Sequence, residues 1–367
     1  MADPAIAVNL LWCVPGDVGG SEEYLVRQLL GLAEADSHLR PTLYVVDGFV
    51  DAHHNLTELF PTVVASFNGA SRVRRITGEA TWFRSRTRRA DLRHHGGGAA
   101  PLGAVRPYVL TIHDLQYRTY PQYFSRTKRA YFAATIGRSV RKARMVVVPS
   151  QYVRESVVDV YGVAPTRVRV VPHGFEMDLL KRVTDEDELR RRFALGDGPV
   201  IVYPAVTHPH KNHQFLIDLL KTRWVDPDLR LVLTGSSGAA ERSITAAKDP
   251  RIRRVGRVSA ADRNGLLKMA EAMVFPSQYE GFGAPLIEAM ALGCPVIASD
   301  STCIPAVVDN AGLVLPLSID AWADALDRVR QNRETLIAAG LRRAEAFTAR
   351  ASGAALAGVY RAALEQS

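Results

Sequence analysis

Residues 275–299 gather the side chains of this chain that are best placed to do chemistry: two carboxylates, Glu280 and Glu288, and two glycines, Gly281 and Gly283. The glycines precede a predicted helix N-terminus. Free backbone N–H groups and the positive end of the helix dipole attract an anion such as a diphosphate there, and glycine lets it approach the backbone. Two carboxylates would repel a phosphate, so we expect them to face hydroxyl groups, which an ionised carboxylate binds in pairs. The pattern predicts a nucleotide-sugar site.

Two short apolar runs flank this segment and define the elements that must hold it. Residues 273–276 and 295–298 suit buried parallel strands, and the segment between them predicts one helix that starts near Pro285 and ends at Gly293. One carboxylate then lies in the loop and the other about one turn into the helix. The alternative interpretation is a capped helix with one exposed and one paired carboxylate.

The complete block is more specific than its parts. Residues 280–283 read E-G-F-G, and residues 288–298 read E-A-M-A-L-G-C-P-V-I-A. This pattern resembles the signature of the retaining family-4 glycosyltransferases of the GT-B fold, and the resemblance covers nearly the whole chain. It implies a catalytic centre that includes Glu280, and substrate binding by Gly281, Phe282, Gly283 and Glu288.

Strand-like and helical runs alternate along the chain, which is typical of a doubly wound parallel sheet. The predicted class is α/β, and the resemblance makes it GT-B: two Rossmann-like doubly wound parallel-sheet domains that face each other across a cleft. A chain of 367 residues is long enough for two cores. We expect an acceptor-binding domain at residues 1–175, a nucleotide-sugar-binding domain at residues 176–345, and a C-terminal helix at residues 346–367 that crosses back to the first domain.

Gly19 and Gly20 follow the first predicted strand, residues 6–13, and precede a helical pattern. They resemble a phosphate loop, although the dinucleotide fingerprint G-x-G-x-x-G is absent, and a purely structural turn is the alternative. The family resemblance implies first-loop glycines that approach the donor phosphate and the acceptor. Both glycines are therefore assigned to substrate binding.

A strand predicted at residues 108–112 delivers His113 to its C-terminal end, where ligands bind in open parallel sheets. A packed or solvated histidine is the alternative interpretation. The position matches the active-site histidine of the family, which is expected to bond the transferred sugar. The resemblance therefore places His113 in the catalytic centre.

Lys211 follows the strand predicted at residues 200–204 and resembles the family's lysine that neutralises the donor diphosphate by charge-assisted contacts. The commonest family pattern also has an arginine several residues before this lysine, and residues 203–210 contain none. Part of the phosphate clamp must therefore come from elsewhere. His208, His210 or the helix N-terminus near residue 285 could supply it.

His208, His210 and His213 surround Lys211 and raise the alternative of a zinc site, since imidazole is a common zinc ligand. No predicted helical pair and no cysteine partner supports that alternative, and Lys211 in the middle would repel a cation. No metal is expected at the site, and no cofactor other than the nucleotide-sugar donor, for which GDP-mannose is the first expectation.

The formal net charge of +8 is unevenly placed, because eight arginines stand between Arg72 and Arg93 against two acidic residues. Trp82 and Phe83 interrupt this basic stretch. Cations with neighbouring aromatic rings suit peripheral contact with an anionic membrane surface. A solvated face and a nucleic-acid surface are the alternatives. Since no nucleic-acid module appears in the sequence, nucleic acid is not expected as a partner.

The composition, 47% hydrophobic and 23% charged, is typical of a globular protein. Cys13, Cys294 and Cys303 are odd in number and lack metal-ligand spacing, which favours a reducing cytosol. No apolar run approaches the ~20 residues of a membrane span, and the N-terminal pattern is not that of a signal peptide. We expect a cytoplasmic protein with peripheral contact at the inner face of the membrane.

The resemblance implies a retaining glycosyltransferase that moves a hexose, mannose first, from a nucleotide-diphosphate sugar to a hydroxyl of a glycan or lipid-linked acceptor. The lysine-asparagine pair at 211–212 and residues 112–116 resemble the bacterial mannosyl- and rhamnosyltransferase branches. The two carboxylates match sugar and ribose binding rather than a glycosidase pair, which implies a front-face mechanism. Three alternatives remain: a UDP-sugar or dTDP-rhamnose transferase, a sugar-nucleotide epimerase, and a noncatalytic nucleotide-sugar-binding protein. The sequence specifies neither the base nor the acceptor.

Overall fold

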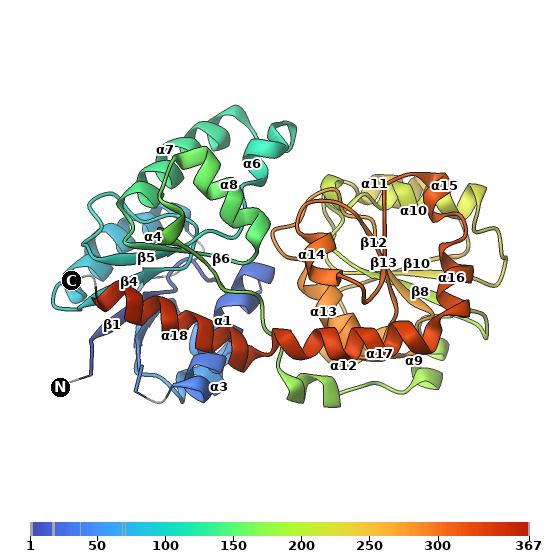
Figure 1. Cartoon of the computed structure of the whole chain (residues 1–367), viewed down its shortest axis with the longest axis horizontal. Helices are drawn as coiled ribbons and strands as arrows, with labels where there is room; N and C mark the ends of the chain where they lie inside the picture. Colours follow the sequence, from blue (N-terminus) through green and yellow to red (C-terminus); the bar gives the residue numbers. More distant parts are fainter. Residues whose placement is uncertain (1–2, 17–18, 37, 68, 70, 366–367) are drawn as a thin grey trace. The chain divides into compact units, whose positions relative to one another are not determined.

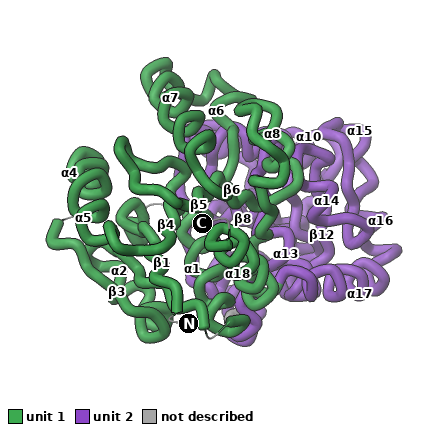
Figure 2. The backbone as a smooth tube through the Cα atoms, turned by 60° about the vertical axis from the view of Figure 1, so that its left-hand side comes forward, with its two compact units in different colours: residues 1–174, 348–367 green, residues 175–347 purple. Residues whose placement is uncertain are grey.

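The computed structural model describes residues 3–16, 19–36, 38–67, 69 and 71–365. The chain divides into two compact units, which are coloured separately in Figure 2. Unit 1 consists of residues 1–174 together with 348–367, and unit 2 consists of residues 175–347. Each unit is described below by itself.

Unit 1 is built on a seven-stranded parallel sheet with the order β3-β2-β1-β4-β5-β6-β7. The strand order reverses between β1 and β4, and in open parallel sheets ligands bind beyond the carboxyl ends of the strands at such a reversal. The strands are β1 (Ile6–Asn9), β2 (Thr42–Val45), β3 (Thr62–Val64), β4 (Leu92–His95), β5 (Tyr108–Thr111), β6 (Met145–Val148) and β7 (Val168–Val170).

Helices cover both faces of this sheet, because alternate strand residues enter different cores. Val109 and Met145 pack into the core that contains α1 and α18, whereas Tyr108 and Val146 pack into the core that contains α7 and α8. The helical elements are α1 (Gly20–Ala35), α2 (Phe49–Ala52), α3 (His54–Thr57), α4 (Arg72–Gly78), the π-helical turn η1 (Glu79–Phe83), α5 (Arg84–Arg86), α6 (Gln116–Thr119), the 3-10 turn η2 (Pro121–Tyr123), α7 (Arg126–Lys142), α8 (Gln151–Tyr161), the 3-10 turn η3 (Pro165–Arg167) and α18 (Ala349–Glu365).

Helix α18 packs along α1, as Figure 1 shows. Two glycines meet where the helices cross: a Cβ on Gly353 would lie 2.0 Å from the carbonyl carbon of Gly31. Further along α18, the Tyr360 hydroxyl bonds Nδ1 of buried His94 at 2.8 Å, and Nε2 of His94 bonds the Thr111 hydroxyl at 2.8 Å. The last helix is therefore fastened to β4 and β5 and forms part of the unit 1 core.

Unit 2 contains a six-stranded parallel sheet with the order β10-β9-β8-β11-β12-β13, which reverses between β8 and β11. The strands are β8 (Val200–Pro204), β9 (Arg230–Thr234), β10 (Ile252–Gly256), β11 (Ala272–Phe275), β12 (Val296–Ser299) and β13 (Leu313–Leu315). The helical elements are the 3-10 turn η4 (Met177–Lys181), α9 (Glu186–Arg192), the 3-10 turn η5 (Pro209–Lys211), α10 (His213–Thr222), α11 (Glu241–Ala247), α12 (Ala260–Met269), α13 (Ala284–Ala291), α14 (Ile304–Val308), α15 (Ile319–Trp322), α16 (Ala325–Gln331), α17 (Arg333–Ala344) and the 3-10 turn η6 (Glu345–Phe347).

The predicted α/β class with two doubly wound parallel sheets is confirmed. The first predicted strand, residues 6–13, is too long. It ends at Asn9, whose side-chain oxygen accepts the N–H of Leu11 at 3.1 Å and turns the chain, and side chains of this type compete with strand pairing in that way. The sequence analysis placed no strand at β2, β3 or β4.

The basic stretch that was expected to form one surface between Arg72 and Arg93 is divided. Arg93 lies in β4 with 2% of its surface exposed, and its guanidinium bonds the carbonyl oxygens of Thr87 and Arg88. Burial lowers the pKa of Arg93. Arg93 is therefore part of the core, and only the earlier arginines of the stretch can meet a surface partner.

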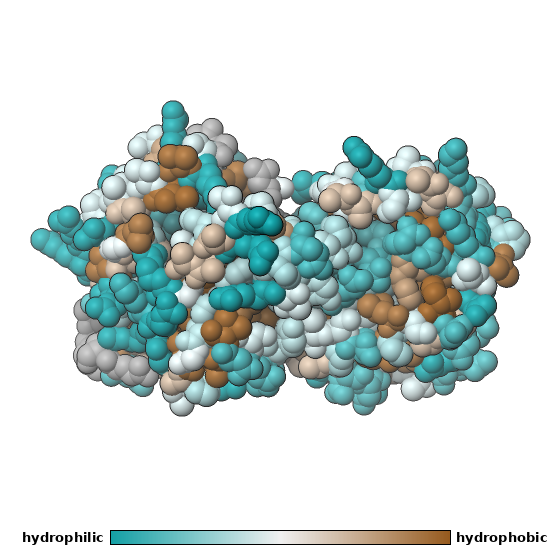
Figure 3. Space-filling view, turned by 90° about the horizontal axis from the view of Figure 1, so that it is seen from above, coloured by the Kyte–Doolittle hydropathy of each residue, from teal (hydrophilic) through white to brown (hydrophobic). Residues whose placement is uncertain are grey.

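The face of each unit seen in Figure 3 is mostly hydrophilic, with hydrophobic side chains in small separate groups. Among the described residues, no helix combines the length and the apolar character needed to cross a membrane.

Candidate active site

The glycine loop of unit 1 lies at the carboxyl end of β1 and begins α1. Gly19 is the N-cap of this helix with φ +70°, a left-handed conformation that glycine adopts without strain. Glu22 in the first turn accepts the N–H of Gly16 at 3.1 Å and pairs with Nε2 of His53 at 2.7 Å. One buried carboxylate thus holds both the loop and the start of the helix that follows Gly20.

His113 lies just beyond β5. Its Nε2 is 2.8 Å from the carbonyl oxygen of Gly96, and because a carbonyl can only accept, Nε2 carries the proton. Burial lowers the pKa of His113 to about 4, against the opposing effect of this hydrogen bond. The imidazole is therefore neutral at pH 7, with Nδ1 as an acceptor. The rings of Trp12 and Tyr24 lie 5.9 and 5.6 Å from it and fix its orientation.

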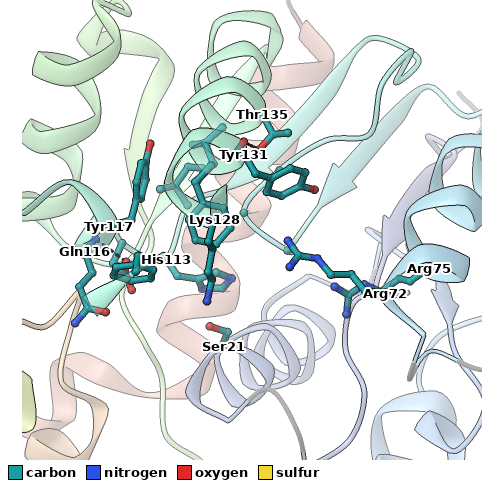
Figure 4. A pocket seen from close by; sticks show the side chains of 17 residues that line it. Ser21, Arg72, Arg75, His113, Gln116, Tyr117, Lys128, Tyr131 and Thr135 are labelled. Carbon is teal, nitrogen blue, oxygen red and sulfur yellow. Dashed lines mark hydrogen bonds between the residues drawn. The ribbon is translucent and has the colours of Figure 1, made fainter. Parts of the chain in front are cut away.

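A pocket of about 490 Å³ in unit 1 brings these two features together, since both His113 and Ser21, the residue after Gly20, line it. Figure 4 shows the arrangement: Ser21 comes from the start of α1, and Lys128 extends from α7 toward the side where Ser21 and His113 lie. The predicted residue His113 therefore lines one cavity together with Ser21, which directly follows the predicted Gly19 and Gly20, and we call this cavity the unit 1 pocket.

In unit 2, Lys211 and Glu280 meet at the strand-order reversal. Lys211 follows β8, Glu280 follows β11, and the Nζ atom of Lys211 lies 2.5 Å from Oε1 of Glu280. Both side chains are mostly buried, with 18% and 11% exposed. The ammonium also lies 5.6 Å from the centre of the Phe275 ring. The two residues predicted to act on a diphosphate and on a sugar are thus brought into direct contact.

Tyr203 on β8 joins the two loops that carry this pair. Its hydroxyl donates to the carbonyl oxygen of Lys211 at 2.8 Å and lies 3.0 Å from the hydroxyl of Ser277. The N–H of Gln278 donates to the carbonyl oxygen of His210 at 2.8 Å. These bonds run between the segment after β8 and the segment after β11, so the two loops form one rigid platform.

The main chain of Glu280 is fixed on both sides by Thr302. The Glu280 N–H donates to the Thr302 hydroxyl at 3.1 Å, and that hydroxyl lies 3.1 Å from the carbonyl oxygen of Glu280. The thiol of Cys303 lies 3.3 Å from the same carbonyl. The main chain of Glu280 is therefore anchored to the loop that carries Thr302 and Cys303, while its carboxylate pairs with Lys211.

The glycine turn before α13 has the geometry predicted from the sequence. Gly283 is the N-cap with φ +88°, and a Cβ there would lie 2.8 Å from a methyl carbon of Leu286. Gly281 precedes it in the same turn. Phe282 differs from its neighbours: its ring is 4% exposed and packs edge-on against Phe347 at 5.6 Å. Phe282 anchors the turn to the core, so any part it has in binding falls to its backbone.

Glu288 lies inside α13 with 5% of its surface exposed, and its Oε2 is 3.4 Å from the guanidinium of Arg263 on α12. Each of the two carboxylates therefore has a cationic partner. The alternative of one exposed and one paired carboxylate is wrong, because neither is exposed. Arg263 was missed by the sequence analysis, and only its place on an adjacent helix reveals it.

Two of the histidines near Lys211, His210 and His213, do not supply the positive charge of the missing arginine. Burial, reinforced by Lys211, lowers the pKa of His210 to about 3, so this side chain carries no charge at pH 7. His213 is likewise buried, and its pKa is lowered to about 4 by burial and then by Arg254 and Lys211. Arg254 on β10 is therefore a cation of this region that the sequence analysis missed. Its Nε donates to Glu241 at 2.9 Å.

Glu241 links Arg254 to the loop before Lys211. Its second oxygen accepts the hydroxyl of Thr207 at 2.6 Å, and that hydroxyl accepts the N–H of Gly238 at 2.6 Å. In the part of the chain that the structure describes, no three His, Cys, Asp or Glu side chains are grouped so that they could hold a metal ion.

The site residues thus form two groups. His113, which lines the unit 1 pocket, and the loop glycines Gly19 and Gly20 lie in unit 1, whereas the other predicted residues lie in unit 2: Lys211, Glu280, Gly281, Phe282, Gly283 and Glu288.

Two family models match the chain with the same division. Residues 18–179 match "Glycosyltransferase Family 4", and residues 185–343 match "Glycosyl transferases group 1". The chain therefore belongs to the glycosyltransferase family that combines these two domains in a GT-B fold.

Two of the similar curated proteins are O-antigen chain mannosyltransferases. The chain is 27% identical over 252 residues to O-antigen chain mannosyltransferase B of Escherichia coli, over 65% of this chain and 66% of that protein. It is 27% identical over 234 residues to the O-antigen chain mannosyltransferase RfbU of Salmonella typhimurium, over 62% of each. The matches thus span just under two thirds of these relatives.

Solved structures share the fold over almost the whole chain. HepE of Anabaena, solved with UDP and glucose, matches with a TM-score of 0.75 at 20% identity, over 97% of this chain and 99% of that one. WaaG, a glycosyltransferase involved in lipopolysaccharide biosynthesis, matches with a TM-score of 0.71 at 14% identity, over 96% and 98%. At these identities the likeness establishes the fold.

Proposed function

We propose that this protein is a retaining glycosyltransferase that moves a hexose, mannose first, from a nucleotide-diphosphate sugar to a hydroxyl of a glycan or lipid-linked acceptor. The observation that carries the proposal is the contact between Lys211 and Glu280 at the strand-order reversal of unit 2, beside the glycine turn that starts α13. It places a cation, a carboxylate and a helix N-terminus where a parallel sheet binds ligands. The O-antigen mannosyltransferase relatives support mannose.

In this proposal Lys211 changes partner when the donor binds. Its ammonium leaves Glu280 and neutralises the diphosphate, together with the N–H groups at the start of α13. Glu280 is then released to accept hydroxyl groups of the hexose. Glu288, deeper in the helix, accepts those of the ribose, and the guanidinium of Arg263 orients its carboxylate.

The transfer itself is proposed to occur on the front face of the sugar. The bond between the anomeric carbon and the diphosphate oxygen breaks, the acceptor oxygen bonds that carbon from the same face, and the departing diphosphate takes the acceptor proton. Neutral His113 would accept a sugar hydroxyl at Nδ1, since its Nε2 proton is engaged by Gly96. No metal is proposed in this step, because Lys211 and the backbone N–H groups supply the stabilising charge.

Release of free nucleotide from GDP-, UDP- and dTDP-sugars tests the proposal. Wild-type protein, Lys211→Gln and Glu288→Gln are compared with Lys221→Gln, which changes an exposed lysine of α10. We expect release from one donor, GDP-mannose first, that falls in both site variants and is unchanged in the control. Conversion of a donor without nucleotide release would show an epimerase. Nucleotide binding without release, even with acceptor glycans, would show a noncatalytic binding protein.

A UDP-sugar is the second donor to test, because the HepE structure of the same fold contains UDP and glucose. The donor panel separates the two bases directly, since release from UDP-glucose alone would replace mannose by glucose in the proposal.

Peripheral contact with the inner face of the membrane is proposed to involve α4. This helix exposes Arg74 and also Val73, whose side chain is 74% exposed, and Arg86 lies over the Trp82 ring at 4.6 Å nearby. Exposed cations beside apolar side chains suit anionic headgroups. After sedimentation with vesicles that contain phosphatidylglycerol, the wild type should be found in the vesicle pellet and a Val73→Glu/Arg74→Glu variant in the supernatant. Equal sedimentation of both would overturn this contact.

A further inference from the structure

The unit 1 pocket carries a positive charge that the proposed chemistry does not use. Arg72 and Arg75 of α4 and Lys128 of α7 line it, whereas Asp114 is the one carboxylate among the described residues of its wall. Figure 4 shows the two arginines entering from one side and the lysine from α7. Two arginines of the predicted basic stretch therefore line the same cavity as His113.

None of these three cations forms an ion pair with a carboxylate in the described ranges of the chain. Arg75 acts on the buried carboxyl of Glu79, whose pKa burial raises and the charge of Arg75 lowers. Arg72 lies over the Tyr131 ring at 4.9 Å, and Lys128 lies 5.2 Å from the centre of the Phe124 ring. Arg75 donates to the carbonyl oxygen of Trp12 at a long 3.5 Å. A ring face orients a cation but leaves its N–H donors for another acceptor. The donors of all three side chains are thus held ready without being neutralised.

Three like charges around one cavity repel each other, and an anion between them removes that repulsion while it accepts charge-assisted hydrogen bonds. Arginine is well suited to this because its planar fork matches the two oxygens of a phosphate or carboxylate. The aromatic wall of the same pocket, which includes Tyr131 and Phe132, offers flat surfaces for an apolar or sugar-ring neighbour of the anion.

The place of the cations relative to His113 indicates which substrate carries the anion. Under the proposed function His113 contacts the transferred sugar, so the remainder of its pocket is left for the molecule that receives that sugar. Ser21 at the start of α1 lies in the same wall, so the positive end of a helix dipole adds to the field of the three cations.

We propose that the acceptor is anionic, and that Arg72, Arg75 and Lys128 bind a phosphate or carboxylate group on it while its hydroxyl lies near His113. The inference rests on the proposed function and names its acceptor class. Two sources share this chemistry: a charged sugar, such as a sugar phosphate or uronate, and the diphosphate of a polyprenyl-linked glycan.

Calorimetric binding to the full chain, without donor, tests the proposal separately from transfer. The probes are mannose 6-phosphate, methyl glucuronoside and farnesyl diphosphate, with methyl mannoside as the neutral reference. We expect at least one anionic probe to bind ten-fold or more tightly than the neutral one. Selective binding of the sugar phosphate or uronate identifies a charged sugar as the source, and selective binding of farnesyl diphosphate identifies the lipid-linked diphosphate.

Variants assign the binding to the pocket. The triple variant Arg72→Gln/Arg75→Gln/Lys128→Gln should bind the anionic probe with an affinity lowered ten-fold or more. Arg129→Gln should leave this affinity unchanged, because Arg129 is an exposed cation of the same helix α7 that lines a different pocket. Lys128→Arg should retain binding, and circular dichroism checks that each variant folds. Hydrogen exchange should show protection in α4 and α7 and not at the loops of Lys211 and Glu280.

Either of two results overturns the inference: anionic and neutral probes that bind equally or not at all, or anion binding that survives the triple substitution. Nucleotide release from the donor panel is measured on the same preparations. Release without anion binding would reject the acceptor class and keep the glycosyltransferase. Anion binding without release would show an anion site in the unit 1 pocket and reject both the glycosyltransferase and the acceptor role of the anion.

Discussion

The ammonium of Lys211 and the carboxylate of Glu280 form a 2.5 Å ion pair between residues that stand 69 positions apart in the sequence. The pair closes the space that a diphosphate and a hexose are proposed to enter. Each side chain supplies the opposite charge that the other needs at this depth, since an unpaired buried charge is costly. In the proposed mechanism, donor binding exchanges the partner of Lys211 from Glu280 to the diphosphate.

Replacing either member of this pair should reduce turnover. Lys211→Gln should lower kcat/KM by about 10- to 150-fold, because a hydrogen bond to a charged group contributes about 1.5–3 kcal/mol. Glu280→Gln should also lower kcat/KM. If the pair acts as one unit, Lys211→Gln/Glu280→Gln will lose less than the sum of the single losses in free energy. Additive losses would show that the two side chains act independently.

Tyr203→Phe should loosen the platform that carries the pair. The variant loses the hydroxyl that bonds the carbonyl oxygen of Lys211 and lies beside Ser277, so the free energy of unfolding should fall by about 1–2 kcal/mol. Chemical denaturation measures this fall, and nucleotide release should show a lower kcat. Ser277→Ala in the same background should add little, because its partner is already absent. A full additional loss would contradict the linkage.

The crossing of α1 and α18 predicts a sharp difference between two glycines of one helix. Gly353→Val should lower the free energy of unfolding by about 3 kcal/mol, since overpacking commonly costs 1–3 kcal/mol and the backbone of Gly31 lies in the way. Gly358→Ala is the matched control: a Cβ there meets nothing within 4 Å, so the change should stabilise α18 by up to about 1 kcal/mol. Thermal unfolding of both variants measures the contrast, and equal melting temperatures would contradict the crossing.

The buried histidines of unit 1 predict that stability falls as the pH is lowered. Burial lowers the pKa of His94 to about 3 and that of His113 to about 4, from an ordinary value of 6.5. At pH values between the lowered pKa of the folded state and the ordinary pKa of 6.5, these histidines are protonated in the unfolded chain but not in the folded chain. The free energy of unfolding therefore rises with pH from about 4 to 6.5. Above 6.5 this contribution is complete.

Denaturation at a series of pH values checks this dependence. The slope between pH 4 and 6.5 should be smaller in His94→Asn than in the wild type, because one proton-binding group is lost from the unfolded chain. The dependence of kcat on pH should show no step from His113 between pH 6 and 8. If His94→Asn leaves the slope of the free energy of unfolding against pH unchanged, this explanation is wrong.

The sequence predicted the elements whose own residues specify them. The strand at 200–204 coincides with β8, because a short apolar run followed by turn residues leaves few alternatives. The helix after Gly283 begins with proline in its first turn and ends at the left-handed Gly293, as the sequence analysis expected. The family pattern led to the other residues of the site, which spacing alone left open.

The missed features depend on partners far along the chain. Strand β4 contains Arg93, His94 and His95, and the sequence analysis placed no strand there, because a run of polar residues does not show that His94 is satisfied in the core by Tyr360, 266 residues away. The unit 1 pocket was not predicted for the same reason: Lys128 on α7 and the arginines of α4 line one cavity only in the folded unit. Such convergence is a property of the tertiary fold.

Unit 1 is formed by two separate segments of the chain, and this has a consequence for folding during synthesis. Unit 2 is a single continuous segment, so it is complete when the ribosome reaches residue 347, whereas α1 still lacks the helix that covers it. Leu25, Leu29 and Leu32 of α1 belong to the core that α18 completes with Leu356 and Tyr360. The apolar face of α1 thus stays without α18 until residues 349–365 have been synthesised, and that interval is when a chaperone would have most to protect.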